Sequence, residues 1–458
     1  MNWIENAINV FSSYAWGTPL LVLLLGGGLY LLFYSRFIPF RYFKHAIKVL
    51  KGDFDESHAK GDIDHYEALS TAIAATVGLG NISGVAVAIT MGGPGAIFWM
   101  WVSAIIGVTT KFFTCSLSVM YRGKDRNGHI EGGPMYVIEQ GLGKKWKILA
   151  IFFSFVGMIG VSPMFQTNQL TQIVVDIYEN ASGVETGMYF KLFVGVCIAI
   201  VVGIVIFGGI KRIGKVAGKL VPFMVALYII CVLVIIGVNI QNVPSSFVLI
   251  FKDAFSGNAV LGGALGSIIV IGVKRAAFSN EAGIGTAPMA HGAALTDEPI
   301  REGLVAMLGP VIDTIIVCTM TALAIIVTGN WKNPDVDGVG VTMSAFEHSI
   351  PYVGVYFLLI CVIIFSLTTL FAFPYYGTKC LGYLVGPKYK KIYNYLFIIA
   401  IVVGSVTPLT TVVNLIDGMY AMMAFPTMIS ALILSPKVKK EAKKYFDKLK
   451  RGEFNVNK

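Results

Sequence analysis

The chain has 458 residues, of which 55% are hydrophobic and 14% are charged, and its formal net charge is +10. Soluble domains carry about 25% charged residues, so this composition excludes a soluble enzyme, a disordered protein and a disulfide-stapled secreted domain. The 50 glycines fit closely packed membrane helices, because small residues let helix backbones approach one another. We therefore expect an all-α protein that crosses the membrane many times.

Eleven apolar stretches are long enough to cross a bilayer, which takes about 20 mostly apolar residues. The predicted spans are residues 16–36, 68–90, 94–120, 148–177, 191–210, 219–240, 260–289, 303–328, 353–376, 392–407 and 411–434.

The basic residues orient these spans. With the N-terminus outside, the segments predicted to lie inside hold 30 Lys and Arg residues, and the outside segments hold two, Lys252 and Lys332. Lys and Arg concentrate on the cytoplasmic side of membrane proteins. Nine of the basic residues lie in the tail, 437–458, which the sequence therefore predicts to be cytoplasmic.

The second span is interrupted near its middle by the string TVGLGNISG, residues 76–84. Glycine weakens a helix, so we expect the backbone to unwind here. A broken helix at membrane depth frees carbonyl groups before the break and amide groups after it, which can bind a cation and a carboxylate. The alternative is close helix packing through Gly80 and Gly84.

The fourth span contains the polar residues Gln166 and Asn168 shortly after Pro163, with Phe165 beside them. Polar side chains inside an apolar span either bond neighbouring helices together or contact a substrate. Phe165 is a candidate wall of a pocket.

The seventh span carries a second interruption, with Lys274, Arg275 and Glu281 inside an apolar stretch. Charged residues within a membrane span mark a functional site by default. The alternative is a short loop between two spans.

Three further spans carry polar candidates. Asp313 in the eighth span and Asp417 in the last are either proton-relay carboxylates or buried structural partners. Thr368 and Thr369 in the ninth span either bond back to carbonyl groups one turn earlier or, beside the oxygens of a broken helix, bind sodium.

The two interruptions are five spans apart, which is typical of transporters built from two inverted repeats. We therefore expect four parts. They are an extra N-terminal helix with a cytoplasmic linker (1–67), a first five-helix repeat (68–240), a second five-helix repeat (241–436) and the basic tail (437–458).

Three strings resemble the alanine-or-glycine:cation symporters, also called the sodium:alanine symporter family. They are TVGLGNISGVAVAITMGGPGAIFWMW (76–101), EGGPMYVI (131–138) and FSNEAGIGTAPMAHGAA (278–294). The piece VGLGN is also similar to the first core helix of the neurotransmitter:sodium symporters. These resemblances imply a leucine-transporter-like fold of five plus five inverted helices, in a cell membrane.

The resemblance also implies the site residues. The carboxylate of the substrate would bind the amides of Leu79 and Gly80. The ammonium group of the substrate would lie near Thr76, Phe278, Ser279 and Asn280. The implied substrate-binding residues are Thr76, Gly78, Leu79, Gly80, Phe165, Gln166, Phe278, Ser279 and Asn280. The implied sodium ligands are the carbonyl groups of Ala74, Val77 and Phe365 and the hydroxyls of Thr368 and Thr369.

We accordingly expect a secondary active transporter, not an enzyme, that carries alanine or glycine with sodium by alternating access. Its partners would be the amino acid, sodium and membrane lipid, with no organic cofactor and no nucleic acid. A proton-coupled carrier using Asp313 or Glu281 is the alternative. A channel is less favoured, because channels need rings of ligands and usually oligomeric symmetry.

Overall fold

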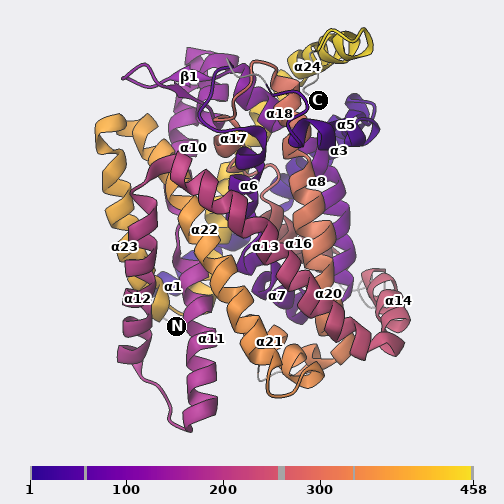
Figure 1. The fold of residues 1–458 in the computed structure, drawn as a ribbon, viewed down its shortest axis with the longest axis vertical. Coiled ribbons are helices and arrows are strands. Elements are labelled where there is room, and N and C mark those ends of the chain that lie inside the picture. Colours follow the sequence, from indigo (N-terminus) through magenta and orange to yellow (C-terminus); the bar gives the residue numbers. More distant parts are fainter. Residues whose placement is uncertain (1–2, 56–58, 256–263, 334–335, 455–458) are drawn as a thin grey trace.

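The computed structural model describes residues 3–55, 59–255, 264–333 and 336–454, and this part of the chain is almost entirely helical (Figure 1). Within these residues, the only sheet is a short antiparallel pair, β1 (Gly123–Lys124) with β2 (Ile130–Glu131). The predicted all-α class is confirmed.

The helices of the N-terminal half end where glycine and proline interrupt the backbone ladder. α6 ends at Thr76, and the chain bends by 58° before it continues. The predicted span 148–177 is divided between α10 and α11, because Pro163 has no amide to continue the ladder. The elements are α1 (Trp3–Ala15), α2 (Thr18–Leu21), η1 (Val22–Gly26), α3 (Gly27–Tyr34), α4 (Ile38–Arg41), α5 (Phe43–Leu50), α6 (His65–Thr76), η2 (Leu79–Asn81), α7 (Ser83–Gly92), α8 (Gly95–Met120), α9 (Pro134–Tyr136), η3 (Val137–Leu142), η4 (Lys144–Trp146), α10 (Lys147–Gly160), α11 (Met164–Ser182), α12 (Met188–Ile206) and α13 (Gly209–Val238).

The C-terminal half contains the second interruption. The chain leaves the helix after Asn280, and Glu281, Gly283 and Gly285 have φ angles of 53°, 86° and 108°. A π-helical stretch, η6, follows Pro310 in the next span. The elements are η5 (Ile240–Asn242), α14 (Val243–Ala254), α16 (Ala264–Asn280), α17 (Ala287–His291), α18 (Pro299–Ala306), α19 (Leu308–Pro310), η6 (Val311–Cys318), α20 (Thr319–Thr328), η7 (Asn330–Lys332), α21 (Val339–Ser349), α22 (Gly354–Val385), η8 (Pro387–Tyr389), α23 (Lys390–Val406) and α24 (Leu409–Lys450).

Eight helical stretches of the described chain are long and apolar enough to cross a membrane, and two bent helix pairs raise the number to ten if each pair is one span. Each of these ten overlaps a predicted span. The remaining predicted span, 260–289, begins outside the described residues, and its described portion consists of α16 and α17. The count of eleven, the inverted repeats and the four-part division stay predictions.

The two interrupted segments pack against each other. α7 and η2 contact α16, α6 contacts α17, and α22 packs along α6 and touches η2. Three elements that are far apart in the sequence therefore meet at the first break.

The basic segments gather at one end of the molecule. Figure 1 shows α5, β1, α18 and the end of α24 together at the top, while α14 and α21 lie at the opposite end. The top elements belong to segments predicted to be cytoplasmic, and Lys252 lies in α14. This grouping agrees with the charge pattern, and the orientation of the termini stays a prediction.

Candidate functional site

The first break is the two-residue stretch Val77–Gly78 between α6 and η2. Gly78 is extended, with φ −140° and ψ −151°. Its amide donates to Oδ1 of Asn81 at 3.2 Å, and the amide of Leu79 donates to Oε1 of Gln166 at 3.1 Å. Side-chain carboxamides thus accept the hydrogen bonds of both backbone amides at the break.

The changed hydrogen bonds of these amides also change the hydrogen-bond partners of the backbone carbonyl groups before them. In an uninterrupted α-helix, the amides of Gly78 and Asn81 would bond the carbonyl oxygens of Ala74 and Val77. Here the Gly78 amide binds the Asn81 side chain, and the Asn81 amide binds the Gly78 carbonyl at 3.1 Å. The Ala74 and Val77 carbonyl groups, both predicted sodium ligands, therefore lose those helical partners.

Glycine is required at this break because other elements approach it closely. A Cβ atom on Gly78 would lie 2.4 Å from Oγ1 of Thr369, and one on Gly80 would lie 3.1 Å from Cδ1 of Phe278. The first distance is far inside van der Waals contact. The glycines let α22 and α16 reach the unwound backbone.

The predicted sodium ligands of α22 form a compact group of oxygens. The hydroxyls of Thr368 and Thr369 donate to the Phe365 carbonyl group at 3.0 Å and 3.1 Å. All three residues are buried, and Thr369 touches the break at Gly78. A hydroxyl that donates one hydrogen bond keeps lone pairs, so these bonds leave the oxygens able to bind a cation.

The second break places a carboxylate beside the first. Glu281 is only 2% exposed and takes a left-handed backbone conformation directly after α16. The Tyr420 hydroxyl donates to its Oε1 at 2.7 Å, and the Thr286 hydroxyl donates to its Oε2. The carboxylate is therefore held by neutral donors from α24 and from its own loop.

A polar cluster joins the two breaks. Nδ2 of Asn81 donates to Oδ1 of Asp313 at 2.8 Å and lies 3.3 Å from Oγ of Ser279, whose hydroxyl also donates to Asp313. Nδ2 of Asn280 donates to the Thr314 hydroxyl at 2.9 Å. Within the described residues, Oδ2 of Asp313 has no hydrogen-bond partner.

A buried cation stands near this cluster. Lys111 of α8 is only 1% exposed, and its charge is attracted to those of Asp313 and Glu281. Its Nζ lies 3.1 Å from the point where a Cβ on Gly309 would be, one helical turn before Asp313. A buried charge is expensive unless an opposite charge is close. Among the described residues no ion pair of Lys111 within 4.0 Å occurs, so its attraction to the two carboxylates acts over a longer distance.

A small cavity lies between the two breaks. Its free volume is about 10 Å³, which is room for about one water molecule. The rings of Phe165 and Phe278 meet edge to face at 4.9 Å, and Tyr420 lies 5.8 Å from Phe278. The lining residues are Ala75, Thr76, Gly80, Ser162, Phe165, Gln166, Phe278, Glu281, Phe373, Ile416 and Tyr420.

Five of the predicted substrate-binding residues line this cavity. They are Thr76, Gly80, Phe165, Gln166 and Phe278.

The other predicted substrate-binding residues lie beside the cavity and have structural partners. The Leu79 amide is bonded to Gln166, and Ser279 and Asn280 bond to η6. Asn280 also accepts the Ala282 amide through Oδ1 at 2.9 Å, so both ends of its side chain are engaged.

Sequence reasoning did not identify the cavity residues from α22 and α24. Phe373, Ile416 and Tyr420 are ordinary apolar or aromatic residues of long spans. In the last span, Asp417, next to Ile416, was the one residue that the sequence marked as a functional candidate. No local pattern distinguishes Tyr420 from an aromatic side chain that faces lipid.

Asp417 ties α24 to α16 close to the cavity. Nζ of Lys274 lies 2.8 Å from its Oδ2, and the Arg275 guanidinium pairs with the same oxygen. Arg275 also lies over the Phe278 ring, with 5.3 Å between Cζ and the ring centroid. The two basic residues of the seventh span are thus paired with Asp417.

A second group of paired charged side chains lies where α6 begins. Oε1 of Glu302 in α18 lies 2.5 Å from Nδ1 of His291, and Oε2 pairs with Nδ1 of His65. All three side chains are buried. The start of α6 and the end of α17 are therefore fastened to one carboxylate.

The EGGP string of the sequence ties β2 to α22 at the same end. Glu131 lies 2.6 Å from Nζ of Lys390 and 3.2 Å from Nζ of Lys379, which donates to the Met289 carbonyl of α17 at 2.9 Å. Burial raises the pKa of Glu131, but the two ammonium groups outweigh burial and hold it below its usual range.

The whole chain matches a known transporter family. A family model described as the sodium:alanine symporter family matches residues 1–458. The sodium/alanine symporter AgcS of Methanococcus maripaludis is 40% identical over 97% of this chain and 98% of its own length. The probable sodium/glutamine symporter GlnT of Bacillus subtilis is 35% identical over 99% of this chain and 93% of its own length.

The fold has a solved counterpart. The structure of MhsT in complex with L-phenylalanine superposes with a TM-score of 0.59 at 15% identity, and covers 83% of this chain and 98% of the MhsT chain. At this identity the similarity identifies the fold alone, which is leucine-transporter-like as the sequence predicted.

Proposed function

Because this chain belongs to the sodium:alanine symporter family, we propose that it carries small neutral amino acids, alanine or glycine, across the cell membrane together with sodium. The observation that carries this proposal is the meeting of two broken helices around one buried cavity. Half-helix amides and released carbonyl groups complement the two ends of a zwitterion.

The substrate carboxylate would take the position of the Gln166 side chain at the Leu79 amide. Oε1 of Gln166 now accepts that amide at 3.1 Å, as a carboxylate oxygen would. The ammonium group would lie toward Thr76, Phe278 and the Glu281 carboxylate, which line the same cavity. Since the cavity holds only about one water molecule, binding requires its aromatic walls to separate.

Sodium would bind between α6 and α22. Sodium is a hard cation and prefers oxygen ligands, as calcium and magnesium do. The carbonyl groups of Ala74 and Val77 lack their helical partners, and Oγ1 of Thr369 lies beside Gly78. The hydroxyls of Thr368 and Thr369 share the Phe365 carbonyl group. This donor set fits a co-transported sodium ion and offers it no full counter-charge.

Transport would proceed by alternating access, with the N-terminus outside and the basic tail in the cytoplasm. The ion pairs of Asp417 with Lys274 and Arg275 would open on one side of the cavity. The Glu302 pairs with His65 and His291 would open on the other.

A proton-coupled carrier is the second candidate. Glu281 is a buried carboxylate in the cavity wall, and Oδ2 of Asp313 has no hydrogen-bond partner in the described part of the chain. A relative in Bacillus subtilis, 36% identical over 82% of this chain, is named a putative sodium/proton-dependent alanine carrier protein.

Calorimetry separates the two candidates. Alanine is titrated into purified protein in sodium and in choline at the same pH. Binding that requires sodium is the expected result. Binding that does not depend on sodium but changes with pH would overturn sodium coupling and favour proton coupling through Glu281 or Asp313. Absence of alanine binding in both salts would overturn alanine as the substrate.

A further inference from the structure

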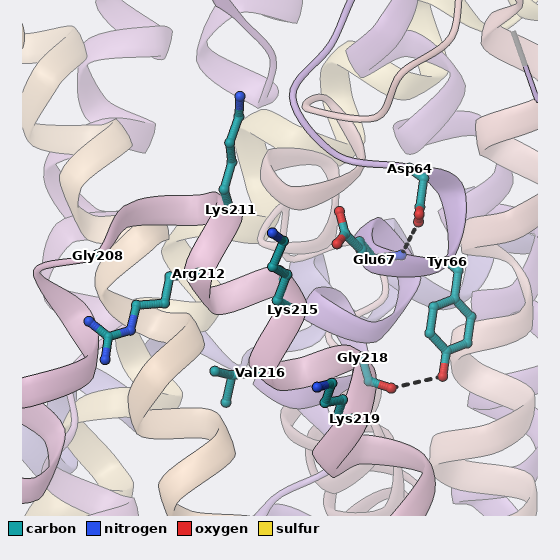
Figure 2. A pocket seen from close by; sticks show the side chains of 11 residues that line it. Asp64, Tyr66, Glu67, Gly208, Lys211, Arg212, Lys215, Val216, Gly218 and Lys219 are labelled. Atoms are coloured by element: carbon teal, nitrogen blue, oxygen red, sulfur yellow. Dashed lines mark hydrogen bonds between the residues drawn. The ribbon is translucent and has the colours of Figure 1, made fainter. Parts of the chain in front are cut away.

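A wide groove lies on the surface between the beginnings of α13 and α6, away from the cavity. Figure 2 shows its cations on α13 and its acidic and aromatic residues on α6. The free volume is about 700 Å³. The lining residues are Asp64, Tyr66, Glu67, Gly208, Lys211, Arg212, Gly214, Lys215, Val216, Gly218 and Lys219.

The charge of the groove is positive and mostly unpaired. Its four cations are all exposed, and no ion pair to any of them occurs among the described residues. Lys211, Lys215 and Lys219 are four residues apart, so they follow one face of α13 at about 6 Å intervals. The four cations outnumber the two carboxylates of the lining, Asp64 and Glu67.

The two carboxylates are directed to α6 and to a lysine. Oδ1 of Asp64 accepts the Glu67 amide at 2.6 Å and so caps α6. Glu67 lies within electrostatic reach of Lys215. Lys211, Arg212 and Lys219 remain to receive a negatively charged ligand.

The surroundings of the groove fit the level of lipid headgroups. Phe207 and Phe223, which flank the cations along the chain, are 50% and 57% exposed, as apolar side chains that face lipid are. Tyr66 stands at the groove with its hydroxyl donating to the Gly218 carbonyl at 2.9 Å. Tyr and Lys side chains are enriched where hydrocarbon meets headgroups.

We propose that this groove binds the phosphate-bearing headgroup of an anionic phospholipid, with its acyl chains against the apolar face of α13. Basic pockets between helices on the cytoplasmic side of membrane proteins hold such headgroups. The bound headgroup would lie on the cations of α13, opposite the first turn of α6. This inference is independent of the transported substrate.

Lipid binding to the purified full-length protein tests the proposal. Phosphatidylglycerol or phosphatidylcholine is titrated into protein in detergent, and bound lipid is counted by native mass spectrometry. The wild type is expected to bind phosphatidylglycerol at least about tenfold more tightly than phosphatidylcholine, since each basic residue near an anionic surface contributes roughly fivefold. Equal affinity for the two lipids would overturn the proposal.

Matched variants locate the site. Replacing Lys211, Arg212 and Lys219 by Gln should abolish most of the preference, and replacing Lys211 and Lys219 by Arg should retain it. The control replaces Lys440, Lys443 and Lys450 by Gln, which removes the same charge from exposed residues of α24. An equal loss in the control would mean that general surface charge attracts the lipid, and would overturn a specific groove.

A free anion is distinguished from a lipid by inorganic phosphate. Phosphate at millimolar concentration should leave the phosphatidylglycerol count unchanged, because it lacks acyl chains. Full displacement by phosphate would overturn the lipid assignment. Folding of each variant is checked by its melting temperature in phosphatidylcholine, where no headgroup contribution is expected.

Discussion

The two breaks of this protein meet at one cavity and have different chemistry. At the first, Asn81 and Gln166 accept the redirected amides, and every group is neutral. At the second, the Glu281 carboxylate is held by Tyr420 and Thr286. Neutral oxygens suit sodium and a zwitterion, whereas a buried carboxylate suits a proton or an ammonium group. In the proposed function, the first break would therefore hold sodium and the substrate carboxylate, and the second would face the substrate ammonium group.

The largest effect should come from filling the first break. A Gly78→Val change puts a side chain where Thr369 already lies, since a Cβ there would be 2.4 Å from Oγ1. We expect sodium-dependent alanine uptake in proteoliposomes to be abolished. Gly237→Ala in α13, where nothing lies within 4 Å of the added Cβ, is the control and should keep wild-type uptake. Normal uptake by the Gly78 variant would mean that the break serves only close helix packing.

The second-largest effect should come from removing the hydroxyls of α22, which should weaken sodium binding. A double change of Thr368 and Thr369 to Val should raise the sodium concentration for half-maximal uptake about thirtyfold, because each hydroxyl contributes about 1 kcal/mol. The control is Thr109→Val, which removes a buried hydroxyl that has no partner in the described residues. An unchanged sodium dependence would remove both threonines from the site.

The second break should respond differently. Glu281→Gln keeps the shape but cannot accept hydrogen bonds from both Tyr420 and Thr286, so uptake should fall roughly threefold. Sodium dependence should persist, because the first break is untouched. The measurement is uptake against sodium at several pH values. Loss of both sodium and pH dependence would show that Glu281 couples transport to protons.

The smallest effect concerns the anchor of α17, the helix that follows the second break. Glu131→Gln leaves Lys379 without a carboxylate and should lower the free energy of unfolding by about 2 kcal/mol at pH 7. The pKa of Glu131 is lowered in the folded protein, so its ionised form stabilises the fold above the ordinary glutamate pKa, and this stabilisation is lost as pH falls through the lowered value.

Melting curves of the wild type and the Glu131 variant should therefore converge in acid. Glu441→Gln is the control, because its pair with Lys444 is exposed and contributes at most about 1 kcal/mol. A difference between wild type and the Glu131 variant that stays constant with pH would contradict the role of its charge.

Much of the fold is predictable from the chain alone, because apolar length and glycine are local signals. The unwound segment at Val77–Gly78 follows from glycine, and the interruption after Asn280 follows from charge within an apolar stretch. The roles of Thr368 and Thr369 were open in the sequence. The structure shows both bonded to Phe365 and Thr369 adjacent to the first break.

Other parts of the site depend on contacts that no local pattern contains. Tyr420 binds Glu281 across 139 positions of sequence, and Gln166 binds the Leu79 amide across 87. Tyr420 is not distinguished by its neighbours in the chain, and Gln166 stands out as a polar residue whose partner the sequence does not give.

Composition, span length and family strings are read along the chain, so the sequence alone predicts a multispanning helical protein of the sodium:alanine symporter family with two weakened helices. That Asn81, Ser279 and Asp313 form one cluster, and that Glu281 faces the cavity, is seen only in the folded structure. The physical reason is that a buried polar group needs a partner, and in this fold the partners are supplied by helices distant in sequence.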